Sequence, residues 1–269
     1  MPEGHTLFRL AREQTTQFAG RPVHVTSPQG RFTAGAALVD GRVLDGVRSY
    51  GKHLFARFGG DTVHVHLGLY GAFTGGTGTP PPARGALRMR WVADGPDGAG
   101  VWTDLRGPTA CEVLTRPEVD AILARLGPDP LRPRADAGRA LRRIAASRTA
   151  VGALLMDQTV LAGVGNVYRA ELLFRHGISP FRPGRAVDEA LWARMWADLV
   201  TLMRAGVRLG RIVTTRPEDR SRRRGVPTRE DAHYVYRRTG EPCRICGTDV
   251  RTEMMVGRNL YWCPVCQPS

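Results

Sequence analysis

The strongest constraint on this chain is a pair of cysteine knuckles near its C-terminal end. Cys243 and Cys246 are separated by two residues, Cys263 and Cys266 repeat that spacing, and sixteen residues lie between the pairs. This pattern is typical of four-cysteine zinc sites, in which each knuckle directs two thiolates at one ion and the stretch between them folds as a hairpin. Two disulfides are the alternative, which a reducing compartment disfavours. We predict a structural zinc finger over residues 233–269, with no open position for catalysis on its Zn2+.

The charge of the chain points to a polyanionic partner. Its 269 residues carry 39 Lys and Arg against 25 Asp and Glu, a net charge of +14. Such a field favours nucleic acid ahead of a membrane surface, and a merely basic protein is the alternative. The sequence contains neither an apolar run of the roughly 18 residues that a membrane span needs nor a signal peptide. We expect a cytoplasmic protein that does not enter membranes.

Lys52 is the only lysine among the 39 basic residues. Arginine can replace lysine on a surface or at a phosphate, but it cannot replace a compact ammonium or a group that must lose its proton. Lys52 is therefore a candidate functional residue, although chance survival would also explain it.

Composition divides the chain into β-rich and helical parts, which predicts an α+β fold. Residues 1–116 contain short apolar stretches separated by Gly, Pro and Asp, after a helix over residues 2–18, and indicate a sandwich or barrel. Residues 75–85 are expected to form a mobile loop. A linker over 117–135, with a helical pattern at 117–126, leads to a helical lobe over 136–232 that is interrupted near Gly163.

The N-terminus offers a nucleophile. Met1 precedes a small residue and is expected to be trimmed, which leaves Pro2 as a secondary amine beside the carboxylate of Glu3. A secondary amine attacks an aldehyde-like carbon to give an iminium, and a neighbouring carboxylate can move protons. A disordered chain start is the alternative.

Two glycine-containing turns are further candidates. At residues 163–166 a helix is expected to end and another to begin near Asn166, which could cap that helix and whose backbone N–H groups suit a phosphate. A generic helix hairpin is the alternative. Leu69 and Tyr70 stand between glycines at a strand end, where they would be either core residues or a wedge between DNA bases.

Other reactive side chains lack a clear partner in the sequence. Four histidines show no carboxylate partner and are expected at the surface or near DNA, not as metal ligands: His5, His53, His64 and His66. Cys111 is left over from the knuckles and is expected to be a buried thiol.

Taken together, these features resemble the bacterial formamidopyrimidine-DNA glycosylase and endonuclease VIII family, and most closely its endonuclease VIII branch. The resemblance runs the length of the chain. Its markers, in order, are Pro2-Glu3, Gly51-Lys52-His53-Leu54, His66-Leu67-Gly68, Asp104-Leu105-Arg106-Gly107, residues 127–131, the turn 161–166, and Gly257-Arg258-Asn259 running into residues 263–267.

The resemblance implies a fold and a reaction. The fold would be an N-terminal helix with a two-layer β-sandwich, a helix-two-turn-helix lobe and a zinc hairpin. The protein would act as a monomer on double-stranded DNA with oxidised bases or abasic sites. Pro2 would attack the sugar C1′ of a flipped nucleotide, Glu3 would protonate the ring oxygen, and β,δ-elimination would cut the strand.

The resemblance also assigns the remaining site residues. Lys52 would grip a phosphate beside the flipped nucleotide, and Asn166 and Arg258 would hold flanking phosphates, with Arg258 also moving a proton during δ-elimination. The resemblance also implies that Leu69 and Tyr70 fill the space that the flipped nucleotide leaves in the duplex. Arg106 would face the base of the opposite strand that has lost its partner (the orphan base), and Arg125 would be a further DNA contact. No metal would take part in the chemistry.

Two departures affect specificity. The family often has an acidic residue where this chain has Thr6, which puts a supporting proton transfer in doubt. The Arg-rich stretch 214–232 lacks the capping segment typical of the formamidopyrimidine branch. We therefore expect oxidised pyrimidines such as thymine glycol and dihydrouracil as substrates, ahead of 8-oxoguanine. A non-catalytic binder of damaged DNA and a zinc-module DNA-binding regulator are the competing classes.

Overall fold

Alternating apolar residues in the N-terminal part of the chain form two antiparallel sheets, with strand orders β2-β1-β7-β8-β6 and β3-β4-β5-β9. The computed structural model describes residues 2–95, 98–225 and 227–268, so Met1 and its predicted trimming lie outside the described residues. The strands are β1 (Pro22–Thr26), β2 (Arg42–Val43), β3 (Gly46–Tyr50), β4 (His53–Phe58), β5 (Asp61–His66), β6 (Ala72–Thr77), β7 (Leu87–Asp94), β8 (Gly100–Arg106) and β9 (Ala110–Leu114).

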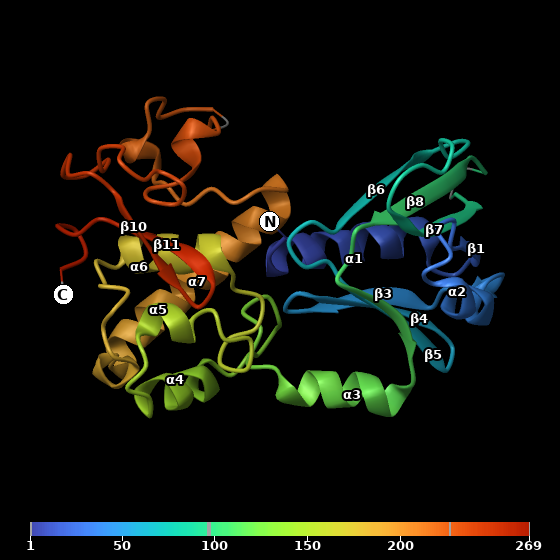
Figure 1. Cartoon of the computed structure of the whole chain (residues 1–269), viewed down its shortest axis with the longest axis horizontal. Coiled ribbons are helices and arrows are strands. Elements are labelled where there is room, and N and C mark those ends of the chain that lie inside the picture. The colour runs from blue at the N-terminus through green and yellow to red at the C-terminus, as the bar shows by residue number, and fades with distance from the viewer. Residues whose placement is uncertain (1, 96–97, 226, 269) are drawn as a thin grey trace. The chain divides into compact units, whose positions relative to one another are not determined.

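The two sheets are the layers of a sandwich, with the helix α1 (Gly4–Phe18) running between them (Figure 1). Leu7 and Phe18 of α1 are fully buried, and Trp91 of β7 is buried with them. The ring of Trp91 meets the edges of Phe18 and Phe58 at centroid distances of 5.7 and 6.0 Å. Aromatic contacts from three elements thus close the core, as the predicted sandwich requires.

The predicted loop over residues 75–85 is wrong at its start, because Gly75, Gly76 and Thr77 belong to β6. They pair with Thr103, Trp102 and Val101 of β8. A Cβ on Gly76 would lie 3.1 Å from the Trp102 ring, so a residue without a side chain lets that ring lie across the strand. The glycines that suggested a loop are there for close packing within a sheet.

The chain divides into two compact units, residues 1–125 and 126–269. The first also contains α2 (Thr33–Val39) and α3 (Arg116–Arg125), and α3 packs Val119 against Phe55 and Leu114 on the outer face of the second sheet. The predicted helical stretch at 117–126 is therefore a helix of the first unit. The division into four domains remains a prediction.

The second unit is helical, with a C-terminal hairpin. Its elements are α4 (Ala137–Ala145), α5 (Val151–Leu154), α6 (Asn166–Arg175), η1 (Gly184–Ala186), α7 (Glu189–Leu209), η2 (Pro217–Asp219), η3 (Glu230–Ala232), β10 (Arg251–Met255) and β11 (Arg258–Trp262). The interruption between α5 and α6 is longer than the predicted break near Gly163, because α5 ends at Leu154.

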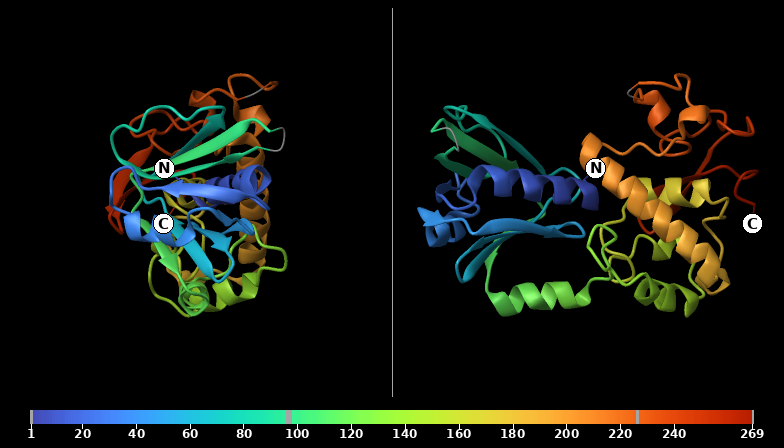
Figure 2. Two further views of the ribbon diagram at one scale, coloured as in Figure 1. Left: turned by 90° about the vertical axis from the view of Figure 1, so that its right-hand side faces the viewer. Right: turned by 180° about the vertical axis from the view of Figure 1, so that it is seen from behind.

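The long helix α7 has clear start and stop signals. The Asp188 carboxylate accepts the Leu191 N–H at 2.7 Å, and Gly210 ends the helix with φ +67°. Figure 2 shows α7 passing alongside α6 within this unit. Among the described residues, no helix is long and apolar enough to cross a membrane.

A buried carboxylate joins α6 to the chain that enters the zinc-finger region. Glu171 is fully buried and accepts the backbone N–H groups of Tyr234, Val235 and Tyr236 at 2.7, 2.9 and 2.8 Å. The Thr214 hydroxyl donates a further hydrogen bond to it. Because these donors need an anionic acceptor, one side chain fixes three consecutive residues against α6.

We expect Glu171→Gln to destabilise the protein by about 2–4 kcal/mol, because an amide turns an NH2 group toward buried donors. Urea unfolding followed by circular dichroism measures this change. Glu189→Gln is the matched control, since Glu189 is exposed in the first turn of α7 and its loss should cost less than about 1 kcal/mol. Equal stability of the two variants would contradict the role given to Glu171.

Candidate functional site

The N-terminus places a buried carboxylate next to Pro2. Glu3 precedes the first turn of α1, and its side chain is fully buried. Its backbone carbonyl accepts the N–H groups of Thr6 and Leu7 at 2.9 and 3.4 Å, which fixes the residue to the helix start. Glutamate is seldom fully buried. Pro2 is half-buried next to Glu3, so the alternative of a disordered chain start does not hold from Pro2 onward.

His5 and Thr6 follow Glu3 in the first turn of α1. His5 is buried, and burial and the Arg9 charge lower the pKa of its imidazole to about 4, so it is neutral at pH 7. The Thr6 hydroxyl lies 3.3 Å from His5 Nε2. Thr6, which stands where an acidic residue is common in the family, therefore contacts a neutral imidazole.

Lys52 sits in the two-residue turn between β3 and β4. Tyr50 pairs with His53 across this turn, and Gly51 has φ +56°. A glycine with positive φ at the first central position is the requirement of a tight hairpin turn. The only lysine of the chain is thus half-buried on a short, rigid connection.

Histidines on β4 and β5 form a row on the outer face of the second sheet. Alternate residues of a strand point to the same face, so His53 stands opposite His66, and His64 stands opposite Glu112 of β9. His53 Nδ1 lies 2.9 Å from His64 Nε2, and His64 Nδ1 lies 2.9 Å from the Glu112 carboxylate. We call these three residues the Glu112–His64–His53 relay.

The relay corrects the expectation of surface histidines without a carboxylate partner. His5 and His64 are each 3% exposed, and His53 and His66 are half-buried. Burial lowers the pKa of all three imidazoles of the row, that of His53 to about 3 with further lowering by His64, His66, Arg125 and Lys52. The partner of His64 lies 48 residues away in the chain, and only the sheet pairing brings the two together.

The loop after β5 presents two apolar side chains to solvent. Leu69 is 38% exposed and Tyr70 is 90% exposed, so the interpretation as core residues is wrong. A Cβ on Gly68 would meet Thr109 Oγ1 at 1.9 Å, and one on Gly71 would meet the Leu67 carbonyl at 2.3 Å. The two glycines therefore allow the tight loop that projects Leu69 and Tyr70.

Arg106 at the end of β8 is held by a buried anion. Asp104 is fully buried and receives Arg90 Nε and Nη2 at 2.7 and 2.9 Å, and Arg106 Nη2 at 3.1 Å. Arg106 also donates to the carbonyl of Arg84. Its guanidinium is therefore oriented by the sheet. Arg125 is exposed at the C-terminal end of α3.

Asn166 braces two elements and does not cap a helix. Gly165 is the capping residue of α6, and Asn166 is 5% exposed in the first turn. Its side chain accepts a hydrogen bond from Arg169 and donates to the Asn259 carbonyl of β11 at 2.9 Å. The predicted cap is wrong because the hairpin engages the amide. The predicted phosphate contact at the start of α6 stays a prediction.

The hairpin β10–β11 carries Arg258 immediately after its turn. Met255 pairs with Arg258, and the two turn residues, Val256 and Gly257, have φ +47° and +70°. Arg258 Nη1 donates to the Gly257 carbonyl at 2.9 Å. Arg258 also lines a pocket of about 490 Å³, whose other walls are Thr149, Ala153, Leu154, Met156, Asp157 and Val256.

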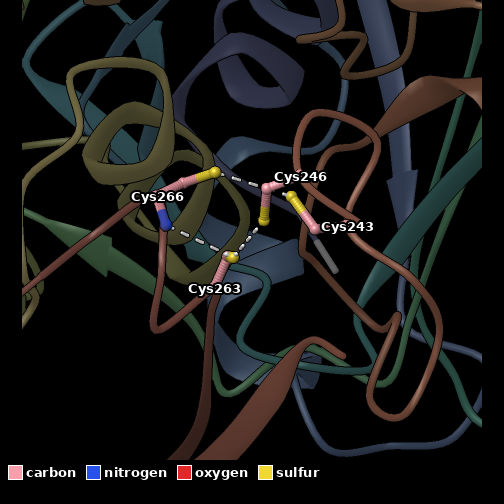
Figure 3. Close-up of side chains that lie close together, drawn as sticks. All are labelled: Cys243, Cys246, Cys263 and Cys266. Atoms are coloured by element: carbon pink, nitrogen blue, oxygen red, sulfur yellow. Dashed lines mark hydrogen bonds between the residues drawn. The ribbon is translucent and has the colours of Figure 1, made fainter. Parts of the chain in front are cut away.

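The four cysteines of the two knuckles converge (Figure 3). Their sulfur atoms all lie within 4.8 Å of one another, with Cys243–Cys266 at 3.8 Å and Cys246–Cys263 at 3.4 Å. A tetrahedron of Zn–S bonds of about 2.3 Å has edges of about 3.8 Å. The cluster therefore fits a structural Zn2+, as the spacing predicts. Cys111 is partly buried, and burial raises the pKa of its thiol to about 12.

Within the second unit the structure brings Asn166 and the Arg258 hairpin together through the Asn259 carbonyl. Four contributors to these sites were missed by sequence reasoning: Asp104, Glu112, Arg169 and Glu171. Each acts through a partner distant in sequence or through a buried charge. Asp104 belongs to one of the sequence markers, and Arg169 and Glu171 follow closely after the turn at 161–166, which is the only signal that could have drawn attention to them.

Three family models match the chain. The formamidopyrimidine-DNA glycosylase N-terminal domain matches residues 1–111, its H2TH domain matches residues 126–218, and a zinc finger found in FPG and IleRS matches residues 240–268. Together these models correspond to the sandwich, the helical lobe and the four-cysteine hairpin.

Relatives of known name match over the full length. Endonuclease 8 1 of Mycobacterium tuberculosis is 55% identical over 99% of this chain and 100% of the relative. The DNA-(apurinic or apyrimidinic site) lyase Nei2 of Mycolicibacterium smegmatis is 37% identical over 100% of both chains. A structure of Lactococcus lactis Fpg in complex with abasic-site DNA has a TM-score of 0.78 at 20% identity, covering 99% of this chain and 100% of that one, and shows the same fold.

The cysteine geometry predicts one zinc ion per chain, measurable by plasma mass spectrometry of purified protein. Cys263→Ser should lower the zinc content to near zero, because three thiolates bind less tightly and Cys263 is fully buried. Cys111→Ser is the control and should retain one zinc. A full zinc complement in Cys263→Ser would contradict the assignment.

Proposed function

The chain belongs to the formamidopyrimidine-DNA glycosylase and endonuclease VIII family, and from that premise we propose that it excises oxidised pyrimidines, such as thymine glycol and dihydrouracil, through a Schiff base on Pro2. Its similarity over the full length to an endonuclease 8 and to an abasic-site lyase identifies it as an endonuclease VIII-like DNA glycosylase and abasic-site lyase. The fully buried carboxylate of Glu3, held at the helix start beside Pro2, is the observation that carries the proposed chemistry.

The reaction begins at the amine of Pro2 once Met1 has been removed. The Pro2 nitrogen bonds to the sugar C1′ as the damaged base leaves with the electron pair of its glycosidic bond. The Pro2 nitrogen then loses its proton, and its lone pair expels the ring oxygen, which Glu3 protonates, so that the sugar ring opens and an iminium forms. The resulting iminium makes the C2′ proton acidic. Loss of that proton expels the 3′ phosphate, a second elimination expels the 5′ phosphate, and water releases the sugar fragment.

The remaining site residues are assigned to DNA contacts. Lys52 and Arg258 would bind phosphates, and the start of α6 at Asn166 would supply backbone N–H donors. The 90% exposed ring of Tyr70, with Leu69, would fill the space left by a flipped nucleotide. Arg106, which is oriented by Asp104, would contact the orphan base. Arg125 would be a further positively charged DNA contact.

The proposed substrate is lesion-containing double-stranded DNA, bound by a monomer. Four thiolates that fit zinc suit a reducing, cytoplasmic compartment. The absence of a capping pattern in residues 214–232 favours pyrimidine lesions. An 8-oxoguanine-selective enzyme and a non-catalytic binder are the alternatives that the next experiment separates.

Borohydride trapping on duplexes tests the nucleophile and the lesion class. We expect a covalent adduct with thymine glycol, dihydrouracil and abasic duplexes, a weaker one with 8-oxoguanine, and none in Pro2→Gly. Glu3→Gln should slow base excision by about 10²–10⁴-fold while retaining adduct formation at an abasic aldehyde, which has no base to expel.

Protein that retains Met1 is the matched control, since it should bind damaged DNA without forming the adduct. A wild-type protein with Met1 removed that binds these duplexes but is never trapped would support the non-catalytic binder. Preferential trapping on 8-oxoguanine would reverse the lesion assignment.

Replacement of Lys52 separates phosphate binding from proton transfer. If Lys52 only grips a phosphate, Lys52→Arg should keep affinity within about threefold, whereas Lys52→Ala should weaken binding about tenfold, the loss of one charged contact. If the ammonium moves a proton, Lys52→Arg should bind normally but cleave about 10²-fold more slowly. Fluorescence anisotropy and single-turnover cleavage give the two readouts, and Arg48→Ala on the neighbouring strand is the control.

A further inference from the structure

The hydrogen bonds of the Glu112–His64–His53 relay define which nitrogen of each ring carries a proton. The Glu112 carboxylate can only accept, so His64 Nδ1 donates to it at 2.9 Å. Neutral His64 then has an accepting Nε2, to which His53 Nδ1 donates at 2.9 Å. Neutral His53 is left with an unprotonated Nε2. The relay thus has an unprotonated nitrogen, His53 Nε2, at one end. At the other end is the Glu112 carboxylate, which can balance the positive charge if His53 takes up a proton.

The surroundings of His53 are rich in positive charge. The charges of Lys52, in the preceding turn, and Arg125, at the end of α3, both act on its ring. His66 lies opposite on β5 with its ring centroid 4.9 Å away, and Tyr50 of β3 is its pairing partner on the other side. Phe55 stacks on His53 and His64, which holds both rings flat against the sheet.

This arrangement suits an anion that arrives with a proton. In the free protein, burial lowers the pKa of His53 to about 3, with smaller contributions from His64, His66, Arg125 and Lys52, so its ring is neutral at pH 7. The negative charge of a phosphate beside Lys52 would favour the protonated ring and raise that pKa. A proton at Nε2 would then leave both relay hydrogen bonds intact, and the Glu112 carboxylate would balance the new charge.

We propose that His53 is a phosphate ligand that takes up a proton as DNA binds, with the Glu112–His64 pair fixing its ring. The inference rests on the proposed function, because the phosphate is that assigned to Lys52. The ligand is a backbone phosphodiester, so the effect should be independent of the lesion base.

The sign of the pH dependence follows from the raised pKa in the complex. Affinity should increase as the pH falls through the pKa of the complex, and the increase should stop below the pKa of the free protein. We expect the Kd for a duplex with a tetrahydrofuran abasic analogue to fall about fivefold between pH 7.5 and 5.5 at constant ionic strength, with proton uptake on binding that rises from near zero at pH 7.5 toward about one at pH 5.5. The analogue has no aldehyde, so binding is measured without chemistry.

Calorimetry in two buffers of different ionisation enthalpy counts the protons. His53→Gln should lose the uptake and the pH dependence, because an amide cannot take a proton. Glu112→Gln should shift the uptake to lower pH, and its side chain is 51% exposed, which spares the fold. His24→Gln is the matched control: it removes an imidazole that is 65% exposed and 2.7 Å from Asp40, and it should behave as wild type.

Unchanged proton uptake in His53→Gln, or uptake lost only in His66→Gln, would overturn the proposal. Unchanged uptake in Glu112→Gln would overturn the relay. If the wild-type protein neither binds the duplex nor forms the borohydride adduct, the proposed function itself is contradicted. Normal binding and trapping without proton uptake would leave that function standing and exclude this inference alone.

Discussion

The buried charge of Glu171 is the interaction on which the second unit depends. Its carboxylate replaces water for three consecutive backbone N–H groups and one hydroxyl, so the chain entering the zinc-finger region cannot move independently of α6. Asn166 ties the same helix to β11 one turn earlier. The start of α6 and the Arg258 turn are therefore parts of one rigid body, and zinc holds the far end of the hairpin.

The first unit buries three kinds of ionisable group. Asp104 is neutralised by Arg90 and Arg106, so its cost of burial is offset by charged hydrogen bonds. The histidines of the outer sheet face stay neutral and share protons along a chain of hydrogen bonds. Glu3 is buried at the chain start. Strand pairing fixes the positions of Asp104 and the histidines, and the start of α1 fixes that of Glu3.

Features that depend on local spacing could be predicted from the sequence, and features that depend on sheet pairing could not. The cysteine knuckles and the helix at the N-terminus follow from neighbours in the chain. The partner of His64 could not be found, since no local pattern predicts that β9 lies beside β5. The glycines of β6 resembled a loop because the Trp102 ring that needs them belongs to another strand.

The lone lysine in the β3–β4 turn has a consequence for labelling. Apart from the chain terminus, Lys52 is the only aliphatic amine in 269 residues. Acylating dyes and amine-directed crosslinkers therefore have two places to react, and one of them is a half-buried position on a rigid turn. A fluorophore or photocrosslinker can be attached there in the native sequence, without engineered cysteines that would compete for zinc.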